Sequence, residues 1–314
     1  MTGLPSPAPD DLAAVRAVIF DVDGVLLDAR PSYHAVAEQV ARRAVTAAVG
    51  ERAAREAVFD RGSEIPRFKA AGGFNDDWEM ACAIALVLLL RARLGPEAPD
   101  LSQVLAETQG LGLSGLMRAR GKQALAGLPP AAAEAVSPRW IARACCALYG
   151  GRAHCRDLFG FEAAEALPDA PEEGLWMREE PLAEAALLQR VAARFPAALY
   201  TGRNPGEARL ALERTGLEVP ERLRWMADGR PRKPDPAGLI WLCGELLATG
   251  GLALFLGDTA DDARAADAAQ DAGAPLIYAH IRPPPAQGDT VRVLTQLLSA
   301  ARDGSGAGAA KETR

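Results

Sequence analysis

The sequence has little of what disulfide frameworks, zinc sites and membrane spans require. Its 314 residues include five cysteines and three histidines. The cysteines are irregularly spaced and form no CxxC pair, which argues against a disulfide framework and a structural zinc site. The longest apolar run, at residues 80–90, is too short to cross a bilayer, and residues 1–10 have no cationic segment before an apolar one. We therefore expect a cytoplasmic protein without a signal peptide or a membrane span.

Positive charge is also scarce, and lysine is scarcer still. The chain has 35 Lys and Arg residues against 41 Asp and Glu, a formal net charge of −6, so neither nucleic acid nor an anionic membrane is an expected partner. Only four of the basic residues are lysines, and a generic surface cation here is therefore an arginine. A lysine inside a motif is correspondingly harder to explain by chance.

Short apolar runs alternate with helix-like segments in part of the chain. The runs cover residues 15–20, 197–200, 223–226, 252–256 and 275–279, and helical patterns separate the last four at residues 207–215, 236–247 and 261–272. Alternating strands and helices indicate a parallel sheet, and the continuous apolar character is typical of strands covered on both faces. We predict an α/β fold with a Rossmann-like parallel-sheet core.

A long Ala-, Leu- and Arg-rich interval separates the first two of these runs. Its periodicity predicts helices at residues 31–60, 77–94, 101–108 and 138–149, with no convincing strand. We predict three parts: a discontinuous α/β core of residues 1–28 and 181–303, an inserted all-helical cap of residues 29–180, and a flexible, Gly-rich tail of residues 304–314.

Two aspartates directly follow the first apolar run. In the segment FDVDGVL, Asp21 and Asp23 stand where the expected strand ends, and Gly24 allows a sharp exit. Ligands of open α/β sheets bind at the carboxyl ends of the strands, and strand alternation places both side chains on one side. Two carboxylates at this spacing suit metal binding and a division of labour between an ionised nucleophile and a proton carrier. A turn with two solvated acids is the structural alternative.

Two later segments place polar side chains where a phosphoryl group could bind. Thr201 and Gly202 follow the second apolar run, although Thr-Gly is also an ordinary turn. Lys233 stands in the segment RKPDP, whose prolines restrict the backbone, and in which Asp235 and Pro236 also fit the start of a helix.

An acidic segment, GDTADD, follows the fourth apolar run and contains Asp258, Asp261 and Asp262. Three acids at a strand end repel one another unless a hard cation with oxygen ligands neutralises them. A helix N-terminus rich in acids explains Asp261 and Asp262 but explains Asp258 less easily.

The order of these segments resembles the haloacid dehalogenase (HAD) superfamily, whose four motifs are Asp-x-Asp, Thr or Ser, Lys, and an acidic motif. The position of the helical insertion resembles that of subfamily IA, which carries a helical C1 cap. Members that cleave carbon–halogen bonds lack the second aspartate of the first motif, whereas phosphatases keep it to protonate a leaving alkoxide. The residues that match the four motifs are Asp21 with Asp23, Thr201, Lys233, and Asp258 with Asp262.

The resemblance implies a Mg²⁺-dependent phosphomonoester hydrolase that works through an aspartyl-phosphate. Asp21 would be the nucleophile and Asp23 the general acid and base, while Mg²⁺ would be held by the Asp21 carboxylate, the Asp23 main-chain carbonyl and Asp258. The resemblance also implies that Thr201, the Gly202 amide and Lys233 bind the phosphoryl oxygens. Asp262 would orient a metal-bound water or Lys233, and the adjacent Asp261 could share that role.

One cap segment, FKAAGGFNDDWE at residues 68–79, combines a Gly-Gly turn with carboxylates and an indole. Together with GLW at residues 174–176 and EEPL at residues 179–182, it resembles a long-capped phosphatase subgroup associated with histidine biosynthesis. That resemblance implies histidinol phosphate as the candidate substrate, whose cation the acids and the indole could meet. Arg67 and Lys69 favour an acidic substrate instead, and helix capping by Asn75 or Asp76 is the structural alternative. The cap residues predicted to set specificity are Lys69, Asn75, Asp76, Asp77 and Trp78.

Several alternatives share the same motif residues. A phosphoglycolate or sugar-phosphate phosphatase would use the same core, and a phosphomutase would use Asp21 and Asp23 but protect the intermediate from water. A non-catalytic phospho-ligand binder would be expected to lack at least one of the motif residues, and all of them are present. The expected partner is a small phosphomonoester, and the expected assembly is a monomer or a homodimer.

Overall fold

The structure, a computed structural model, describes residues 8–74, 76–282 and 289–306. It divides into two compact units. The core unit is formed by Met1–Asp28 and Glu180–Arg314, and the cap unit by Ala29–Glu179.

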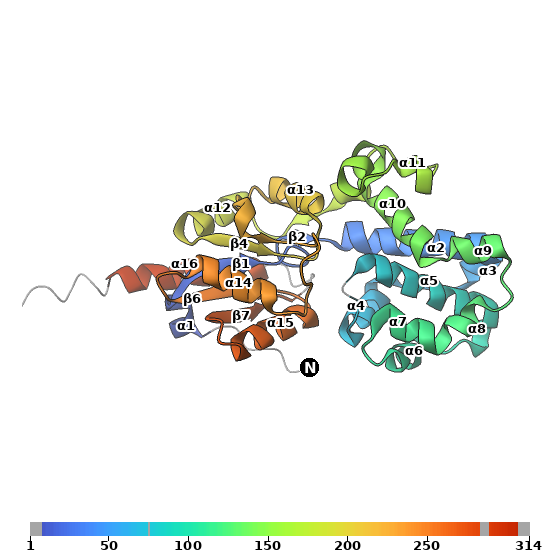
Figure 1. Cartoon of the computed structure of the whole chain (residues 1–314), viewed down its shortest axis with the longest axis horizontal. Coiled ribbons are helices and arrows are strands. Elements are labelled where there is room, and N and C mark those ends of the chain that lie inside the picture. Colours follow the sequence, from blue (N-terminus) through green and yellow to red (C-terminus); the bar gives the residue numbers. More distant parts are fainter. Residues whose placement is uncertain (1–7, 75, 283–288, 307–314) are drawn as a thin grey trace, which may run out of the picture. The chain divides into compact units, whose positions relative to one another are not determined.

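The core unit is built around a five-stranded parallel sheet in the order β5-β4-β1-β6-β7. Figure 1 labels four of these strands, β4, β1, β6 and β7. Nearly every residue of β1, β4 and β6 is buried, as expected for continuous apolar runs that are covered on both faces. From β1 the chain continues to β4 and β5 on one side of the sheet, and then returns to form β6 and β7 on the other side of β1. The strand order therefore reverses at β1. The α/β prediction is confirmed, with strands β1 (Val15–Phe20), β4 (Ala197–Tyr200), β5 (Arg224–Trp225), β6 (Leu252–Gly257) and β7 (Leu276–His280).

Helices cover this sheet in two groups. Helices α1, α12 and α16 pack together, and α14 packs against α15. Helix α16 continues to Gly306, so residue 304, where the tail was predicted to begin, lies inside a helix; residues 307–314 of that tail lie outside the described residues. The helices of the core unit are α1 (Pro9–Ala13), α12 (Ala185–Arg194), α13 (Pro205–Thr215), the short η5 (Glu221–Leu223), α14 (Ala237–Leu246), α15 (Ala260–Asp271) and α16 (Asp289–Gly306).

The cap unit consists of helices and their connections over the residues that the structure describes. Its centre is α5, whose residues from Met80 to Leu90 are all buried, and which packs against α2 and α10. The elements are η1 (Arg30–His34), α2 (Ala35–Val49), α3 (Glu51–Glu56), α4 (Arg61–Ala71), α5 (Asp77–Leu94), η2 (Gly95–Glu97), α6 (Leu101–Thr108), α7 (Gly112–Leu116), η3 (Met117–Gly121), α8 (Lys122–Leu125), α9 (Pro130–Ala135), α10 (Pro138–Phe159), α11 (Ala163–Ala166) and η4 (Leu175–Arg178).

The helix expected at residues 31–60 is divided into several pieces. Gly50 has a φ of 85°, a left-handed value that glycine adopts readily, and it separates α2 from α3. Helical periodicity continues across such a break because both pieces still bury one apolar face. The single long helix was therefore a wrong prediction.

A short antiparallel ladder lies where the chain leaves the core unit and where it returns. Strand β2 (Leu27–Asp28) pairs with β3 (Glu180–Pro181), and the Leu182 amide donates to the carbonyl of Leu26. Two-residue strands have no periodicity that a sequence pattern could reveal. The ladder ties the segment after the first motif to the start of the second half of the core unit.

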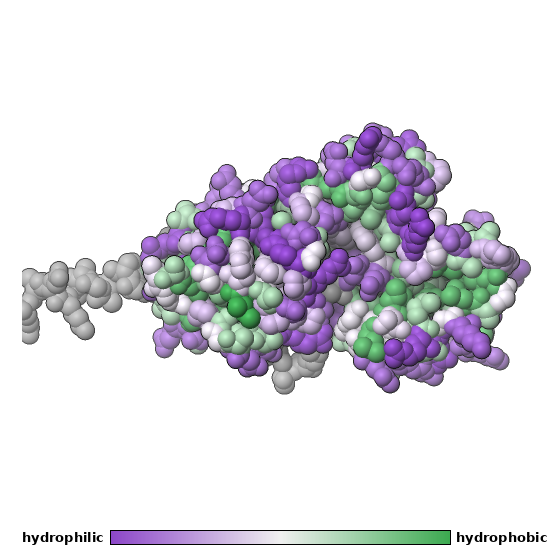
Figure 2. Space-filling model, viewed as in Figure 1, coloured by the Kyte–Doolittle hydropathy of each residue, from purple (hydrophilic) through white to green (hydrophobic). Residues whose placement is uncertain are grey.

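The surface of the core unit is mixed. Figure 2 shows hydrophilic side chains over much of its visible face, interrupted by smaller apolar areas. Its exposed apolar side chains include Ile240 and Trp241 of α14, which are 40% and 37% exposed. Among the described helices, none combines the length and the apolar character that crossing a membrane requires.

Candidate active site

Three of the motif segments begin where neighbouring strands end. Asp21 follows β1, Thr201 follows β4 and Asp258 follows β6, and these three strands are adjacent and parallel in the sheet. The Asp21 amide donates to the carbonyl of Leu256 at 2.9 Å, so the first and last of these ends are joined directly. The carboxyl ends of parallel strands lie at one edge, and that edge is where open α/β sheets bind ligands.

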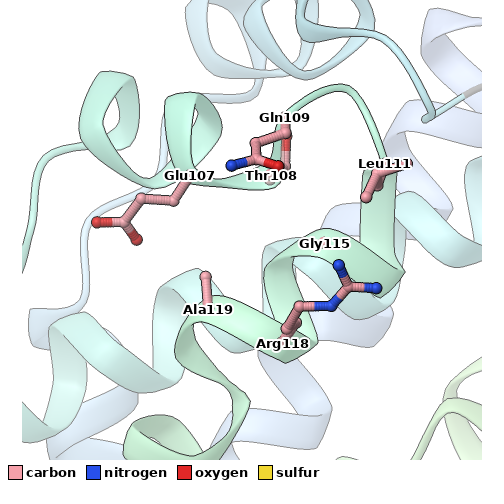
Figure 3. A pocket seen from close by; sticks show the side chains of 7 residues that line it. All are labelled: Glu107, Thr108, Gln109, Leu111, Gly115, Arg118 and Ala119. Atoms are coloured by element: carbon pink, nitrogen blue, oxygen red, sulfur yellow. The ribbon is translucent and has the colours of Figure 1, made fainter.

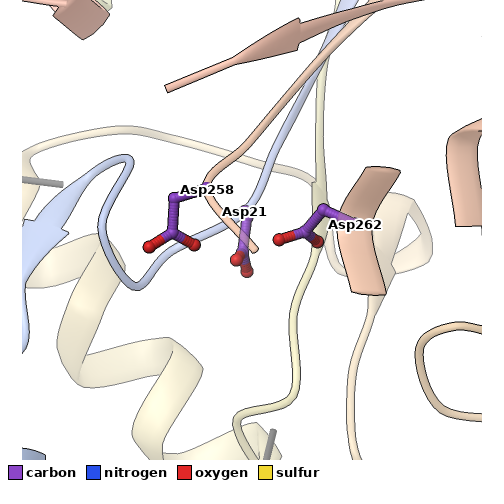
Figure 4. Close-up of side chains that lie close together, drawn as sticks. All are labelled: Asp21, Asp258 and Asp262. Carbon is purple, nitrogen blue, oxygen red and sulfur yellow. The ribbon is translucent and has the colours of Figure 1, made fainter. Parts of the chain in front are cut away.

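Three carboxylates gather at this edge (Figure 4). Asp21, Asp258 and Asp262 each offer an oxygen atom, and these atoms all lie within 4.8 Å of one another. Asp21 is 5% exposed and Asp262 is fully buried. Because oxygen-rich clusters of this kind suit hard divalent cations, the three residues form a candidate metal site.

Gly24 makes the approach of Asp258 possible. Its φ is 73°, in the left-handed region, and a Cβ atom at this position would overlap the Asp258 carboxylate. The turn that contains it is held by the Gly24 amide, which donates to the carbonyl of Leu27 at 2.9 Å. A residue with a side chain would therefore strain the turn and displace one carboxylate of the candidate metal site.

Lys233 contacts two of the three carboxylates. Its Nζ lies 2.9 Å from Asp21 Oδ1 and 2.6 Å from Asp262 Oδ1, with the ring of Tyr200 5.0 Å away. Burial opposes the charge of this lysine, but Asp21 and Asp262 more than compensate and raise the pKa of Lys233 above its usual value. The lysine is therefore a fixed cation at the side of Asp21.

Asp262 is held from two directions. One carboxylate oxygen contacts Lys233, and the other accepts hydrogen bonds from the Thr259 amide at 3.0 Å and the Thr259 hydroxyl at 2.6 Å. Thr259 is the N-cap of α15, so the start of this helix fixes the carboxylate. Asp262 thus positions Lys233, whereas Asp261 pairs with Arg264 on the same helix.

The protonation of Asp21 is finely balanced. Burial has the largest effect on its pKa and raises it, because burial disfavours the charged form. Lys233 lowers the pKa, and the negative charges of Asp262 and Asp23 raise it further. Together they raise the pKa of Asp21 to about 7. A divalent cation beside this carboxylate would favour its ionised form.

Asp23 has a partner that the sequence analysis did not assign. Its carboxylate pairs with Arg203, whose Nη2 lies 2.7 Å from Asp23 Oδ1. Arg203 is only 2% exposed and follows the predicted phosphate-binding pair Thr201-Gly202. Arg203 stands in the segment TGRN beside the predicted phosphate-binding pair. The sequence has 31 arginines, however, and nothing in it indicates which of them pairs with an aspartate 180 residues away.

Two of the predicted phosphate-binding residues, Thr201 and Gly202, lie at the end of β4. Thr201 is 4% exposed, its amide donates to the carbonyl of Trp225 at 3.0 Å, and its Oγ1 accepts a hydrogen bond from the Arg203 amide at 3.2 Å. Gly202 is exposed, and a Cβ atom there would meet nothing within 4 Å. The backbone at Gly202 therefore borders open space beside a fixed Thr201.

The cap residues predicted to set specificity have structural partners within the cap unit. Asp76 is the N-cap of α5 and accepts hydrogen bonds from the amides of Trp78 and Glu79. Asp77 pairs with Lys69 at 2.9 Å. The ring of Trp78 lies 5.2 Å from that of Tyr33, centroid to centroid. Asn75 lies outside the described residues.

A shallow pocket also lies in the cap unit, at the turn between α6 and α7 (Figure 3). Its polar lining includes Glu107 and Arg118, and Glu107 is paired with Arg120 at 2.5 Å. The lining that the structure describes contains none of the predicted site residues.

Comparisons with known proteins agree with this architecture. A family model described as "Hydrolase: haloacid dehalogenase-like hydrolase" matches residues 15–270. The fold is similar to that of phosphatase Tt82 from Thermococcus thioreducens, with a TM-score of 0.58, 21% identity, and coverage of 88% of this chain and 98% of that chain. A putative phosphoglycolate phosphatase from Lactobacillus plantarum matches at a TM-score of 0.40 and 18% identity, covering 84% of this chain and 86% of that one. No curated protein matches. At 21% identity, the likeness to phosphatase Tt82 concerns the fold alone.

Proposed function

The chain belongs to the haloacid dehalogenase-like hydrolases, and from this premise we propose that it is a Mg²⁺-dependent phosphatase of small phosphomonoesters. The observation that carries the proposal is the position of Asp21. It is buried at the end of β1, in contact with Lys233 and close to Asp258 and Asp262, which follow β6. A carboxylate held beside a fixed cation and a candidate metal site is suited to attack phosphorus.

The donor set fits one divalent cation. Asp21, Asp258 and Asp262 each offer a carboxylate oxygen within 4.8 Å of the others, and carboxylate oxygens are the ligands that a hard divalent cation prefers. Asp262 is paired with Lys233, so within the acidic cluster Mg²⁺ would be held by Asp21 and Asp258, together with the main-chain carbonyl of Asp23. When bound, it would offset charge on the phosphoryl oxygens.

The proposed reaction has two steps. In the first, an Asp21 oxygen forms a bond to phosphorus, the bond from phosphorus to the ester oxygen breaks, and Asp23 gives its proton to that oxygen. In the second, water attacks the phosphorus of the aspartyl-phosphate and gives a proton to Asp23, which releases phosphate and restores Asp21. Thr201 and Lys233 would hold the phosphoryl oxygens throughout. The presence of Asp23 supports phosphate-ester cleavage over carbon–halogen cleavage, in which the leaving halide needs no proton.

The proposal predicts that the purified protein hydrolyses p-nitrophenyl phosphate when Mg²⁺ is present. EDTA should abolish the activity and excess Mg²⁺ should restore it, because the acidic cluster needs the cation. Release of p-nitrophenol is the measurement. Binding of phosphomonoesters without turnover of any member of a broad panel would instead favour a phospho-ligand binder.

Metal affinity should depend on pH in a defined direction. Because the pKa of Asp21 is about 7 without metal, protons compete with Mg²⁺ below that pH. The apparent Mg²⁺ affinity should be constant above about pH 8 and fall by up to about tenfold per pH unit below about pH 7. Titration of the protein with Mg²⁺ by calorimetry tests this. An affinity that does not change between about pH 6 and about pH 8 would contradict it.

The substrate proposal rests on the cap. Histidinol phosphate is the candidate that the resemblance of residues 68–79 suggests. The contacts of this segment favour a structural role, since Asp76 caps α5 and the charge of Asp77 is balanced by Lys69. A phosphomonoester panel that includes histidinol phosphate, phosphoglycolate and sugar phosphates is therefore the experiment that identifies the substrate.

The Lys69–Asp77 pair gives the discriminating variant. We expect Asp77→Asn to lower the free energy of unfolding by about 0.5–1 kcal/mol, because it removes a partly buried ion pair and a charge in the first turn of α5. The ratio of kcat/KM for histidinol phosphate to that for p-nitrophenyl phosphate should not change. Lys69→Met, which breaks the same pair from the other side, is the matched control and should show a similar loss of stability. A KM that rises only for histidinol phosphate in Asp77→Asn would show instead that Asp77 recognises the substrate cation.

A further inference from the structure

Arg203 is a buried cation to which the motifs assign no role. It is 2% exposed, and the contacts of its guanidinium with Asp23 include Nη2 at 2.7 Å from Oδ1 and Nε at 3.3 Å from each carboxylate oxygen. Burying an arginine is costly unless its charge is paired. The side-on contact of this guanidinium with a carboxylate is therefore a specific ion pair.

The two partners are not equally constrained. The side chain of Arg203 is 1% exposed and that of Asp23 is 33% exposed. The backbone of Arg203 is also fixed, because its amide donates to Thr201 Oγ1 at 3.2 Å and its carbonyl accepts from the Ala227 amide at 2.9 Å. The residue after it, Asn204, begins α13 with a reciprocal capping box. Arg203 is therefore the rigid member of the pair, and Asp23 is the member that is held.

The orientation of Asp23 matters for the proposed reaction. A general acid must lie within hydrogen-bond reach of the leaving oxygen, and small displacements of a catalytic group cost large factors in rate. Asp23 stands directly before Gly24, whose left-handed backbone begins a turn, and one third of its side chain is open to solvent.

From this geometry we infer that Arg203 is a positioning residue that fixes the carboxylate of Asp23 for proton transfer to the leaving group. The inference rests on the proposed phosphatase function. It assigns to the arginine of the TGRN segment a role separate from phosphate binding by Thr201 and Gly202. The guanidinium fork suits this role because it meets both oxygens of the carboxylate, which a lysine cannot do in the same geometry.

The test compares two substrates of similar shape whose leaving groups differ. p-Nitrophenolate departs with little help from an acid, whereas phenolate is a poorer leaving group and needs more. In Arg203→Met we expect kcat/KM for phenyl phosphate to fall at least about tenfold more than kcat/KM for p-nitrophenyl phosphate. Asp23→Asn should show the same selective loss, and Arg203→Lys should restore part of it. Arg224→Met is the matched control, because Arg224 is a half-buried arginine of the same unit that donates to the carbonyl of Val219.

The outcomes are distinct. A selective loss in Arg203→Met that is absent from Arg224→Met supports the positioning role. Equal losses on both substrates in a folded Arg203→Met protein, or in Arg203→Lys if the methionine variant does not fold, overturn it and leave the phosphatase function intact. A wild-type protein that hydrolyses neither substrate overturns the proposed function and this inference with it.

Discussion

Asp21→Asn should abolish turnover while leaving the fold intact. An amide cannot form the acyl-phosphate, so we expect kcat to fall by at least about 10⁴-fold on every phosphomonoester that the protein hydrolyses. The substitution preserves the size of a side chain that is 5% exposed, and it removes a carboxylate whose charge burial disfavours. Rates and thermal midpoints measured side by side check both parts of the expectation.

A matched variant controls for the loss of one negative charge. Asp267 lies exposed on α15 of the same unit, and Asp267→Asn should retain full activity. Because deamidation converts an asparagine back to aspartate, the sequence at position 21 should be verified by mass spectrometry. Appreciable turnover by intact Asp21→Asn protein would rule out Asp21 as the nucleophile.

Lys233→Met should have the second largest effect, on both activity and stability. The lysine contacts Asp21 and Asp262 at 2.9 Å and 2.6 Å, so its removal leaves two buried carboxylates without their cation. We expect kcat/KM near neutral pH to fall by about 10²–10³-fold, and the free energy of unfolding of the metal-free protein to fall by about 3–5 kcal/mol.

The loss of stability in Lys233→Met should shrink as the pH falls. Protonation of Asp21, whose pKa is already raised by burial, removes one of the two charges that the lysine balanced. Denaturant unfolding at acidic and neutral pH measures this difference. Lys122→Met, which alters an exposed lysine on α8, should leave both stability and activity unchanged. If Lys233→Met behaves in the same way, the buried ion pairs do not support the site.

The sequence predicted those elements whose local signals agree with their burial. Strands β1 and β4 begin and end at the expected residues, since each is an apolar run beside the other in the sheet, broken in β1 only by the exposed Arg16. Helices α5 and α6 also match, and each is preceded by an aspartate that caps it, Asp76 and Asp100. Local pattern and tertiary environment favour the same structure at these places.

Contacts between distant residues escaped the sequence analysis. The pattern of the motifs predicted which side chains meet at the strand ends, because parallel strands bring their carboxyl ends together. It did not predict that Asp23 faces Arg203, or that Asp77, a candidate partner for a substrate cation, pairs with Lys69. Side-chain pairing depends on how a loop or a helix turn is oriented, and residue types in one sequence do not specify that orientation.

The covalent step is the centre of this account, and trapping the intermediate tests it most directly. The protein with Mg²⁺ would be mixed with p-nitrophenyl phosphate, quenched in acid during turnover, and treated with borohydride, which reduces an aspartyl-phosphate to homoserine. Peptide mass spectrometry would then be applied to residues 15–28. We predict homoserine at position 21 in the wild-type protein, and none in substrate-free protein or in Asp21→Asn. A wild-type protein that turns over under these conditions, with the modification at another residue or at none, would contradict the proposed mechanism.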